Sequence, residues 1–186
     1  MSAKKQVTKQ MILSAALNML KAGGMEAVTV KALARKLNCS TQPIYLSFDK
    51  MEELRSELSS LAVSEFLKEI GRDYEAVNLY GMSYIQFSKD EKYLFQFLFM
   101  RQNAFEELHE VLSPIINSSI ARLSSHYGIS PEEAHHFHDQ LWMHTHGIAS
   151  MIATGFCEWN MDKVEQMILE CEKYLGQKYG GQNVFQ

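Results

Sequence analysis

The stretch LARKLNCSTQPIYLSFDK, residues 33–50, predicts two short helices joined by a tight turn. The first helix follows Thr29, whose side chain is suited to cap it. Asn38 tolerates the left-handed backbone conformation that ends many helices, so the turn is expected to begin there. Apolar residues recur along the first helix at the spacing of a single helical face; they are Val30, Leu33, Ala34 and Leu37.

Ser40 or Thr41 is predicted to cap the second short helix. Pro43 then falls in its first turn, where a missing backbone N–H costs nothing. Ile44 and Phe48 are its clear apolar anchors, so most of this helix is polar. A helix of about two turns is not stable alone, and both short helices must therefore pack against longer neighbours.

Two longer helices are predicted on either side of this pair. One runs from about Lys5 to Ala22 and is stopped by Gly23 and Gly24. The other begins at Met51 and runs to about Arg72, with leucines on one face at 54, 58 and 61. Two short helices supported in this way form a helix-turn-helix, in which the second helix presents N-terminal polar side chains to the DNA major groove.

Charge is distributed unevenly along the chain, whose net charge is −4. Residues 1–50 hold eight Lys or Arg against two acidic residues, a balance of +6, whereas residues 51–186 hold ten against twenty, a balance of −10. A basic unit on an acidic body is suited to placing one end of a molecule on a phosphate backbone. We therefore expect residues 1–50 to form a domain that binds double-stranded DNA and residues 51–186 to form a second domain.

Composition limits the class of protein further. The 186 residues are 46% hydrophobic, enough for a buried core, and sustained strand-like alternation is absent, which predicts an all-α fold. Three scattered cysteines favour neither a disulfide framework nor a cysteine-rich zinc site, so a reducing, cytoplasmic setting is expected. Because no segment reaches the roughly 20 apolar residues of a membrane helix, no membrane partner is expected.

The order of motifs in ILSAALNMLKAGGMEAVTVKALARKLNCSTQPIYLSFDKMEEL, residues 12–54, resembles the N-terminal DNA-binding domain of the tetracycline repressor (TetR) family. The shared pattern is a helix, a Gly pair, a Thr before a short helix, then Ile-Tyr and Phe. Asn38, Ser47 and Met51 stand where glycine, histidine and lysine are common in that family. The resemblance implies that Tyr45 places its hydroxyl on a DNA phosphate.

Candidate DNA contacts follow from side-chain chemistry and from this resemblance. Gln42 is suited to a bidentate contact with adenine, and Thr41 and Ser47 are candidates for base edges or nearby phosphates. Lys31 and Lys50 would position the domain on the backbone without reading sequence. Each has a structural alternative, as a cap, a half-buried ring or a solvated lysine. The full set is Thr29, Lys31, Ser40, Thr41, Gln42, Pro43, Tyr45, Ser47 and Lys50.

The acidic body is predicted to be a helical bundle that forms a homodimer through its last two helices. Ser130-Pro131-Glu132-Glu133 is a strong helix start, and the helix it opens follows a long helix that contains Pro114. Its second half is rich in small residues, which let a partner helix approach; they are Gly147, Ala149, Ser150, Ala153 and Gly155. The final helix, about Asp162–Tyr179, has an apolar face made of Val164, Met167, Ile168, Cys171 and Leu175. A dimer would present two recognition helices to a pseudo-palindromic operator.

Residues 80–100 and 142–147 resemble the C-terminal domain of a TetR subgroup marked by Trp and then His-Gly, here Trp142, His146 and Gly147. Tyr80 and the stretch LFQFLF, residues 94–99, match its aromatic-rich middle. The resemblance implies a pocket for a small hydrophobic effector of unknown identity, although aromatic residues at helical spacing also form ordinary cores. The candidate lining residues are Tyr84, Phe87, Phe95, Phe99, Met100, Trp142, Met143 and His146.

Five histidines lie within twelve residues, at 135, 136, 138, 144 and 146. Only residues three or four apart share a helical face, so His135 and His138 are the best local pair for a metal ion. A metal-responsive regulator is therefore an alternative, but the prediction is no metal and no other cofactor.

Two other classes of protein fit the sequence less well. An enzyme is disfavoured because the chain has neither a Gly-rich phosphate loop nor a nucleophile elbow. A helical protein-interaction module could share the acidic body, yet it would not need the basic N-terminal unit. The sequence thus predicts a TetR-type transcriptional regulator, in the family's usual mode a repressor released from its operator by an effector.

Overall fold

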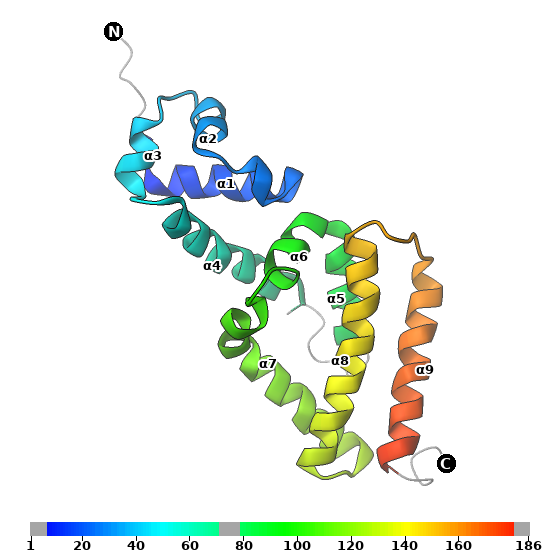
Figure 1. Ribbon diagram of the computed structural model, residues 1–186. Coiled ribbons are helices and arrows are strands. Elements are labelled where there is room, and N and C mark those ends of the chain that lie inside the picture. The colour runs from blue at the N-terminus through cyan, green and yellow to red at the C-terminus, as the bar shows by residue number, and fades with distance from the viewer. Residues whose placement is uncertain (1–6, 71–78, 181–186) are drawn as a thin grey trace.

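The computed structural model describes residues 7–70 and 79–180 (Figure 1). Within these residues the secondary structure is entirely helical, as predicted, and no strand occurs. The N-terminal helices are α1 (Lys9–Gly23), the 3₁₀ turn η1 (Met25–Ala27), α2 (Val30–Lys36), α3 (Gln42–Ser47) and α4 (Met51–Ile70). The others are α5 (Leu79–Asp90), α6 (Lys92–Phe99), α7 (Ala104–Tyr127), α8 (Pro131–Ala153) and α9 (Met161–Gly180). No helix in the described ranges is long and apolar enough to cross a membrane.

The local signals of the helix-turn-helix act as predicted. The Thr29 hydroxyl oxygen accepts a hydrogen bond from the Ala32 backbone N–H, 3.2 Å away, and so caps α2. Asn38 has φ of 51°, the left-handed conformation expected after α2. Ile44 and Phe48 are buried, and Pro43 lies in the first turn of α3. The chain therefore turns between α2 and α3 as its sequence indicates.

Two details of the predicted caps differ from the structure. Thr41 occupies the N-cap position of α3 but adopts a helical backbone, and its side chain makes no capping hydrogen bond. The prediction of a side-chain cap there was wrong, because a cap needs the extended backbone that Thr29 has. α1 begins at Lys9 after a cap from Thr8 that was missed. The predicted ends at Lys5 and Arg72 lie outside the described residues.

The C-terminal domain is built around α8. It lies against α5 on one side and α9 on the other, with α7 crossing its N-terminal half (Figure 1). The predicted helix start is confirmed, because Ser130 and Glu133 form a reciprocal capping box at the beginning of α8. Pro114 lies inside α7, as predicted. This packing places one face of α8 toward the interior of the domain and leaves another toward solvent.

The apolar face of α9 is used within the subunit. Val164, Ile168 and Leu175 are buried against the rest of the chain, so these three do not form an outward surface for a second copy. Ala149 and Ala153, from the small-residue stretch of α8, are buried in the same way. The face predicted for dimerisation is thus divided between the subunit's own core and the solvent.

Two helices connect the N-terminal unit to the C-terminal domain. α4 passes from one to the other, and α6 packs against α1 (Figure 1). Lys21 of α1 donates to Glu91 beside α6, 2.7 Å away, and lies 3.6 Å from Glu65 of α4. The hydrogen bond to Glu91 raises the pKa of Lys21. Gly24, with φ of 75°, lies close to the ring of Tyr93, so a side chain there would meet both strain and crowding. The domain boundary at residues 50 and 51 stays a prediction.

Candidate nucleic-acid interface and ligand cavity

α3 lies at the outer end of the molecule and presents polar side chains to solvent. Ile44 and Phe48 point into the core, which leaves Gln42 and Tyr45 exposed, and the tyrosine retains 60% of its accessible surface. A large exposed aromatic side chain with a polar tip is suited to contact another molecule. The structure thus places the predicted reading helix where it can approach a DNA groove.

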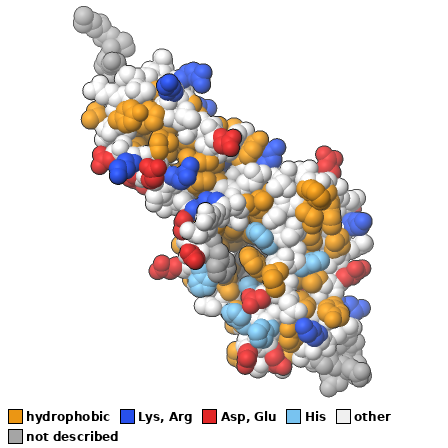
Figure 2. All heavy atoms as spheres, in the orientation of Figure 1, with side chains coloured by type: hydrophobic (Ala, Val, Ile, Leu, Met, Phe, Trp, Pro, Cys, Tyr) orange, Lys and Arg blue, Asp and Glu red, His pale blue; other side chains and the backbone are white. Residues whose placement is uncertain are grey.

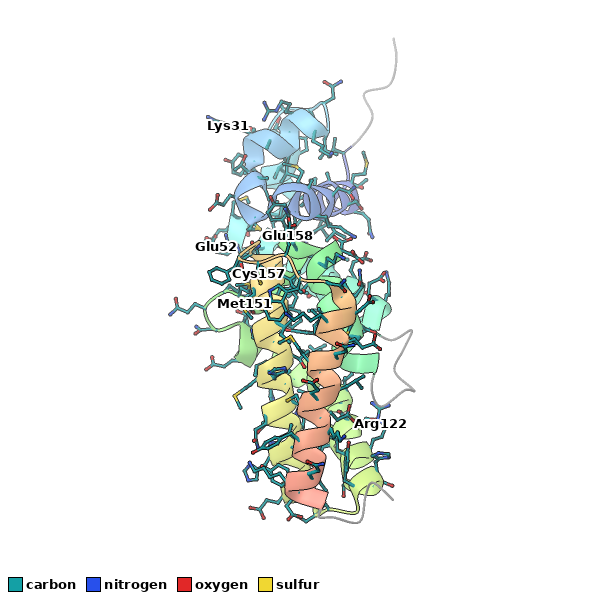
Figure 3. The ribbon with its side chains drawn as sticks, turned by 90° about the vertical axis from the view of Figure 1, so that its right-hand side faces the viewer. Lys31, Glu52, Arg122, Met151, Cys157 and Glu158 are labelled. Atoms are coloured by element: carbon teal, nitrogen blue, oxygen red, sulfur yellow. The ribbon has the colours of Figure 1, made fainter. Side chains whose placement is uncertain are left out.

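The other candidate DNA residues border this helix. Thr29, Lys31, Ser40 and Lys50 are exposed, and Lys31 projects from α2 at the N-terminal end of the molecule (Figure 3). Thr41, Pro43 and Ser47 are half-buried. Because Ser47 donates to the Pro43 carbonyl, 2.9 Å away, its hydroxyl is already engaged within α3. The roles of all these candidate residues in DNA binding stay predictions.

A cavity of about 400 Å³ lies inside the C-terminal domain, between α4, α5, α6, α7 and α8. Its wall is mostly apolar and aromatic, as in many ligand sites. Figure 2 shows histidine side chains gathered beside apolar ones on this part of the surface. The described lining residues are Phe66, Tyr84, Phe99, Ala104, Leu108, His109, Leu112, Ile116, His135, His138, Asp139, Trp142, Met143 and His146.

The structure brings five of the eight predicted ligand residues to this cavity: Tyr84, Phe99, Trp142, Met143 and His146. The other three predicted residues do not line the cavity. Phe87 and Phe95 are buried in the core beside the cavity. Met100 follows the end of α6 and is 41% exposed. Sequence spacing alone could not separate core aromatics from lining ones, and the side chain of Tyr80 lies outside the described part.

Aromatic side chains and one histidine form the inner wall. The Tyr84 hydroxyl and His146 Nδ1 are 2.8 Å apart and share a hydrogen bond. Trp142 stacks on the His146 ring with a centroid distance of 5.1 Å, and Phe95 stacks on it at 6.0 Å. Burial lowers the pKa of His146, which favours the neutral imidazole. His146 and Trp142 thus form a fixed, uncharged part of the wall.

The residues that sequence reasoning missed lie on three helices, the first being Phe66 of α4. On α8, His135, His138 and Asp139 share a face with Trp142 and His146, because they are spaced by three or four residues. That spacing could have extended the predicted site toward the start of α8. On α7, Leu108, Leu112 and Ile116 recur every four residues, but only tertiary packing places them opposite α8. No group of three or more potential metal ligands occurs among the described residues.

An exposed recognition helix on a basic unit, joined to a helical domain with an internal cavity, defines a DNA-binding regulator of the helix-turn-helix class. Residues 12–58 match the family described as "Bacterial regulatory proteins, tetR family". The match supports a TetR-family transcriptional regulator and the predicted resemblance of residues 12–54. It ends before Trp142 and His146, so the resemblance to the Trp/His-Gly subgroup stays a prediction. No curated protein matches the chain.

Proposed function

We propose that the protein is a homodimeric transcriptional repressor that leaves a pseudo-palindromic DNA operator when a small hydrophobic effector fills the C-terminal cavity. The observation that carries the proposal is the outward position of α3, with Gln42 and Tyr45 exposed on a basic unit. Bidentate contact from a glutamine suits adenine, and the tyrosine hydroxyl suits a phosphate.

The packing of α6 supports coupling between the cavity and the DNA-binding unit. Phe99, in the last turn of α6, lines the cavity, while the body of α6 packs on α1. Lys21 and Glu91 join α1 to the start of α6. An effector that binds the DNA-incompetent arrangement more tightly weakens DNA affinity by its ratio of affinities for the two states.

The outer surfaces of α8 and α9 support the dimer. Gly147 has open space around it, so a partner helix can approach closely there. Leu169 and Tyr174 of α9 remain exposed, as does Phe156 after α8; Met151 and Cys157 lie around this end of α8 (Figure 3). Exposed apolar groups of this kind are typical of association surfaces.

The dimer is tested by sedimentation. Leu169→Glu should convert the dimer to monomers, whereas Val111→Glu, at a similarly exposed position of α7, should not.

The function is tested by selecting bound fragments from randomised duplex DNA with the intact protein and with Tyr45→Ala. Recovery of a pseudo-palindrome by the intact protein alone supports a dimeric sequence reader. Affinity for that operator should fall steeply with salt, and Tyr45→Phe should weaken it with helicity intact. Recovery of nothing by folded, effector-free protein contradicts the proposal and favours a helical interaction module.

A further inference from the structure

The polar groups of the 400 Å³ cavity differ in their depth. His135, Asp139 and Met143 lie at its mouth, since their side chains are about half exposed. His138 lies further in, with only 9% of its surface accessible. Its ring also lines a second cavity of about 40 Å³, which adjoins the first because Tyr84 and Trp142 border both. His138 is therefore the buried polar residue at the junction of the two spaces.

The imidazole of His138 lacks the hydrogen bonds that a buried polar ring normally makes. Its Nδ1 atom is fully buried and has no partner among the described residues. The nearest carboxylate oxygen, Oδ1 of Asp139, is 3.6 Å away, which is too long for a hydrogen bond. A buried polar group left unsatisfied destabilises the fold. Because Nδ1 is itself fully buried, a ligand in the cavity could add a hydrogen bond to this ring only at Nε2.

The surroundings of His138 indicate which ring nitrogen carries the proton. Burial lowers the pKa of His138, although Asp139 partly opposes the shift, so the neutral ring is favoured. Although Oδ1 of Asp139 is too far away for a hydrogen bond, its negative charge lies on the Nδ1 side of the ring and favours the tautomer with the proton on that atom. Nε2 is then a hydrogen-bond acceptor. Because Nδ1 is fully buried, Nε2 is also the ring nitrogen that a ligand can reach.

The charge of the cavity wall disfavours an anionic ligand. None of its described lining residues is lysine or arginine, and the one acidic residue is Asp139. A carboxylate in this space would lose its hydration without a cationic partner, which is costly. Arg122 lines only the smaller cavity, so the larger cavity around the ligand body has no guanidinium in its described wall. A neutral ligand meets no such penalty.

We propose that the ligand is a small neutral molecule with an aromatic or alkyl body and a hydroxyl group that donates a hydrogen bond to His138 Nε2. The body would lie between Phe66, Phe99 and Trp142, and the hydroxyl would point toward the junction with the smaller cavity. A cavity of this volume is at the small end of ligand sites, and suits a molecule on the order of a dozen non-hydrogen atoms. This inference rests on the proposed effector role of the cavity.

Three matched probes test the ligand class: 4-butylphenol, butylbenzene and 4-butylbenzoate. The chain has two tryptophans, so Trp159→Phe leaves Trp142, on the cavity wall, as the fluorescent reporter. In this background 4-butylphenol should bind and 4-butylbenzoate should bind least. The ratio of phenol to butylbenzene affinity should fall about three- to tenfold in His138→Leu, the loss expected for one neutral hydrogen bond.

His144→Leu is the matched control. His144 is on the same helix and also has a buried nitrogen without a partner, at Nε2, but it does not line either cavity. This variant should keep the phenol to butylbenzene ratio, and His138→Gln, which retains hydrogen-bonding groups, should keep part of it. Circular dichroism establishes that each variant is folded. If His138→Leu does not fold, the test uses the ratio of 4-butylphenol to butylbenzene affinity in His138→Gln. A ratio equal to that of the Trp159→Phe background then overturns the inference.

Three results would overturn the inference: a ratio that His138→Leu leaves unchanged, tightest binding by 4-butylbenzoate, or binding by none of the probes. Operator affinity, measured separately, distinguishes these failures from failure of the proposed function. If the ratio depends on His138 but 4-butylphenol leaves operator affinity unchanged, the ligand class stands and effector release fails. If no probe binds while DNA binding is intact, the ligand class alone fails.

Discussion

The N-terminal unit and the C-terminal domain place their functional residues in opposite ways. The candidate DNA contacts lie between Thr29 and Lys50, on one continuous segment, and most of them are exposed. The cavity takes its described lining from α4 through α8, and much of that lining is buried. A surface that reads DNA can therefore be assembled from neighbours in sequence, whereas an enclosed site needs distant helices brought together.

The first prediction concerns the small core that supports the DNA-reading surface. Phe48 is 3% exposed and anchors α3, while nearby Leu46 is 80% exposed. Phe48→Ala should lower the free energy of unfolding by about 3–5 kcal/mol, because it removes a buried ring and leaves a cavity. Leu46→Ala should change it by less than about 0.5 kcal/mol. Urea unfolding followed by circular dichroism measures both, and equal effects would contradict this division of α3 into an anchored and an exposed face.

A second prediction concerns helix packing in the C-terminal domain. A Cβ atom at Gly176 of α9 would lie 2.6 Å from Cε1 of Tyr127, whose hydroxyl donates to Glu172, 3.2 Å away. Gly176→Ala should destabilise the domain by about 1–3 kcal/mol through overpacking, although alanine normally stabilises a helix relative to glycine.

The double variant Tyr127→Leu with Gly176→Ala tests whether the clash is the cause. Removing the ring relieves the overlap, so the two changes should be non-additive in thermal unfolding. Strict additivity would mean that Gly176 is not needed for the approach of α9 to Tyr127.

A lysine on α2 provides the third prediction, which concerns the DNA-binding surface. Lys31 projects from α2 at the end of the molecule (Figure 3), and Lys163 of α9 is also exposed but belongs to the other domain. Lys31→Ala should reduce the slope of log affinity against log salt concentration by about one, because one phosphate contact is lost. Lys163→Ala should leave the slope unchanged when DNA affinity is measured over the same salt series. Equal slopes for both variants would remove Lys31 from the DNA interface.

The smallest effect is expected at the junction between the two regions. Glu65 accepts a hydrogen bond from Lys68 and lies near Lys21, and these contacts lower its pKa from the ordinary 4.5. A lowered carboxyl pKa stabilises the fold above pH 4.5, and this contribution is lost as the pH falls through the folded-state pKa.

Glu65→Gln should therefore destabilise the protein at pH 7 by less than about 1 kcal/mol, since the side chain is partly exposed to solvent, and the difference should vanish in acid. Denaturant unfolding at pH 7 and pH 3.5 measures this difference, with Glu170→Gln, at an exposed position of α9, as the control. If Glu65→Gln destabilised the protein more at pH 3.5 than at pH 7, the prediction would be contradicted.

Much of the N-terminal unit could be predicted because its signals are local. Thr29, Asn38 and Pro43 each act within a few residues of their own position, and the structure confirms all three. The prediction that was wrong, a side-chain cap at Thr41, also concerned a local signal. The residue type is suited to capping, but Thr41 has a helical backbone in the tight turn. The pattern Ser130-Pro131-Glu132-Glu133 likewise located the beginning of α8 and its capping box.

The sequence by itself determined the all-α class, the helix-turn-helix and the basic N-terminal surface, because capping, periodicity and charge depend on neighbouring residues. Only the tertiary structure decided that Phe95 is core while Phe99 borders a cavity, and that the apolar face of α9 is buried within its own subunit. It also placed His138 at the junction of two cavities. These outcomes depend on how five separate helices pack, and side-chain spacing along one helix carries no information about the helix that lies opposite.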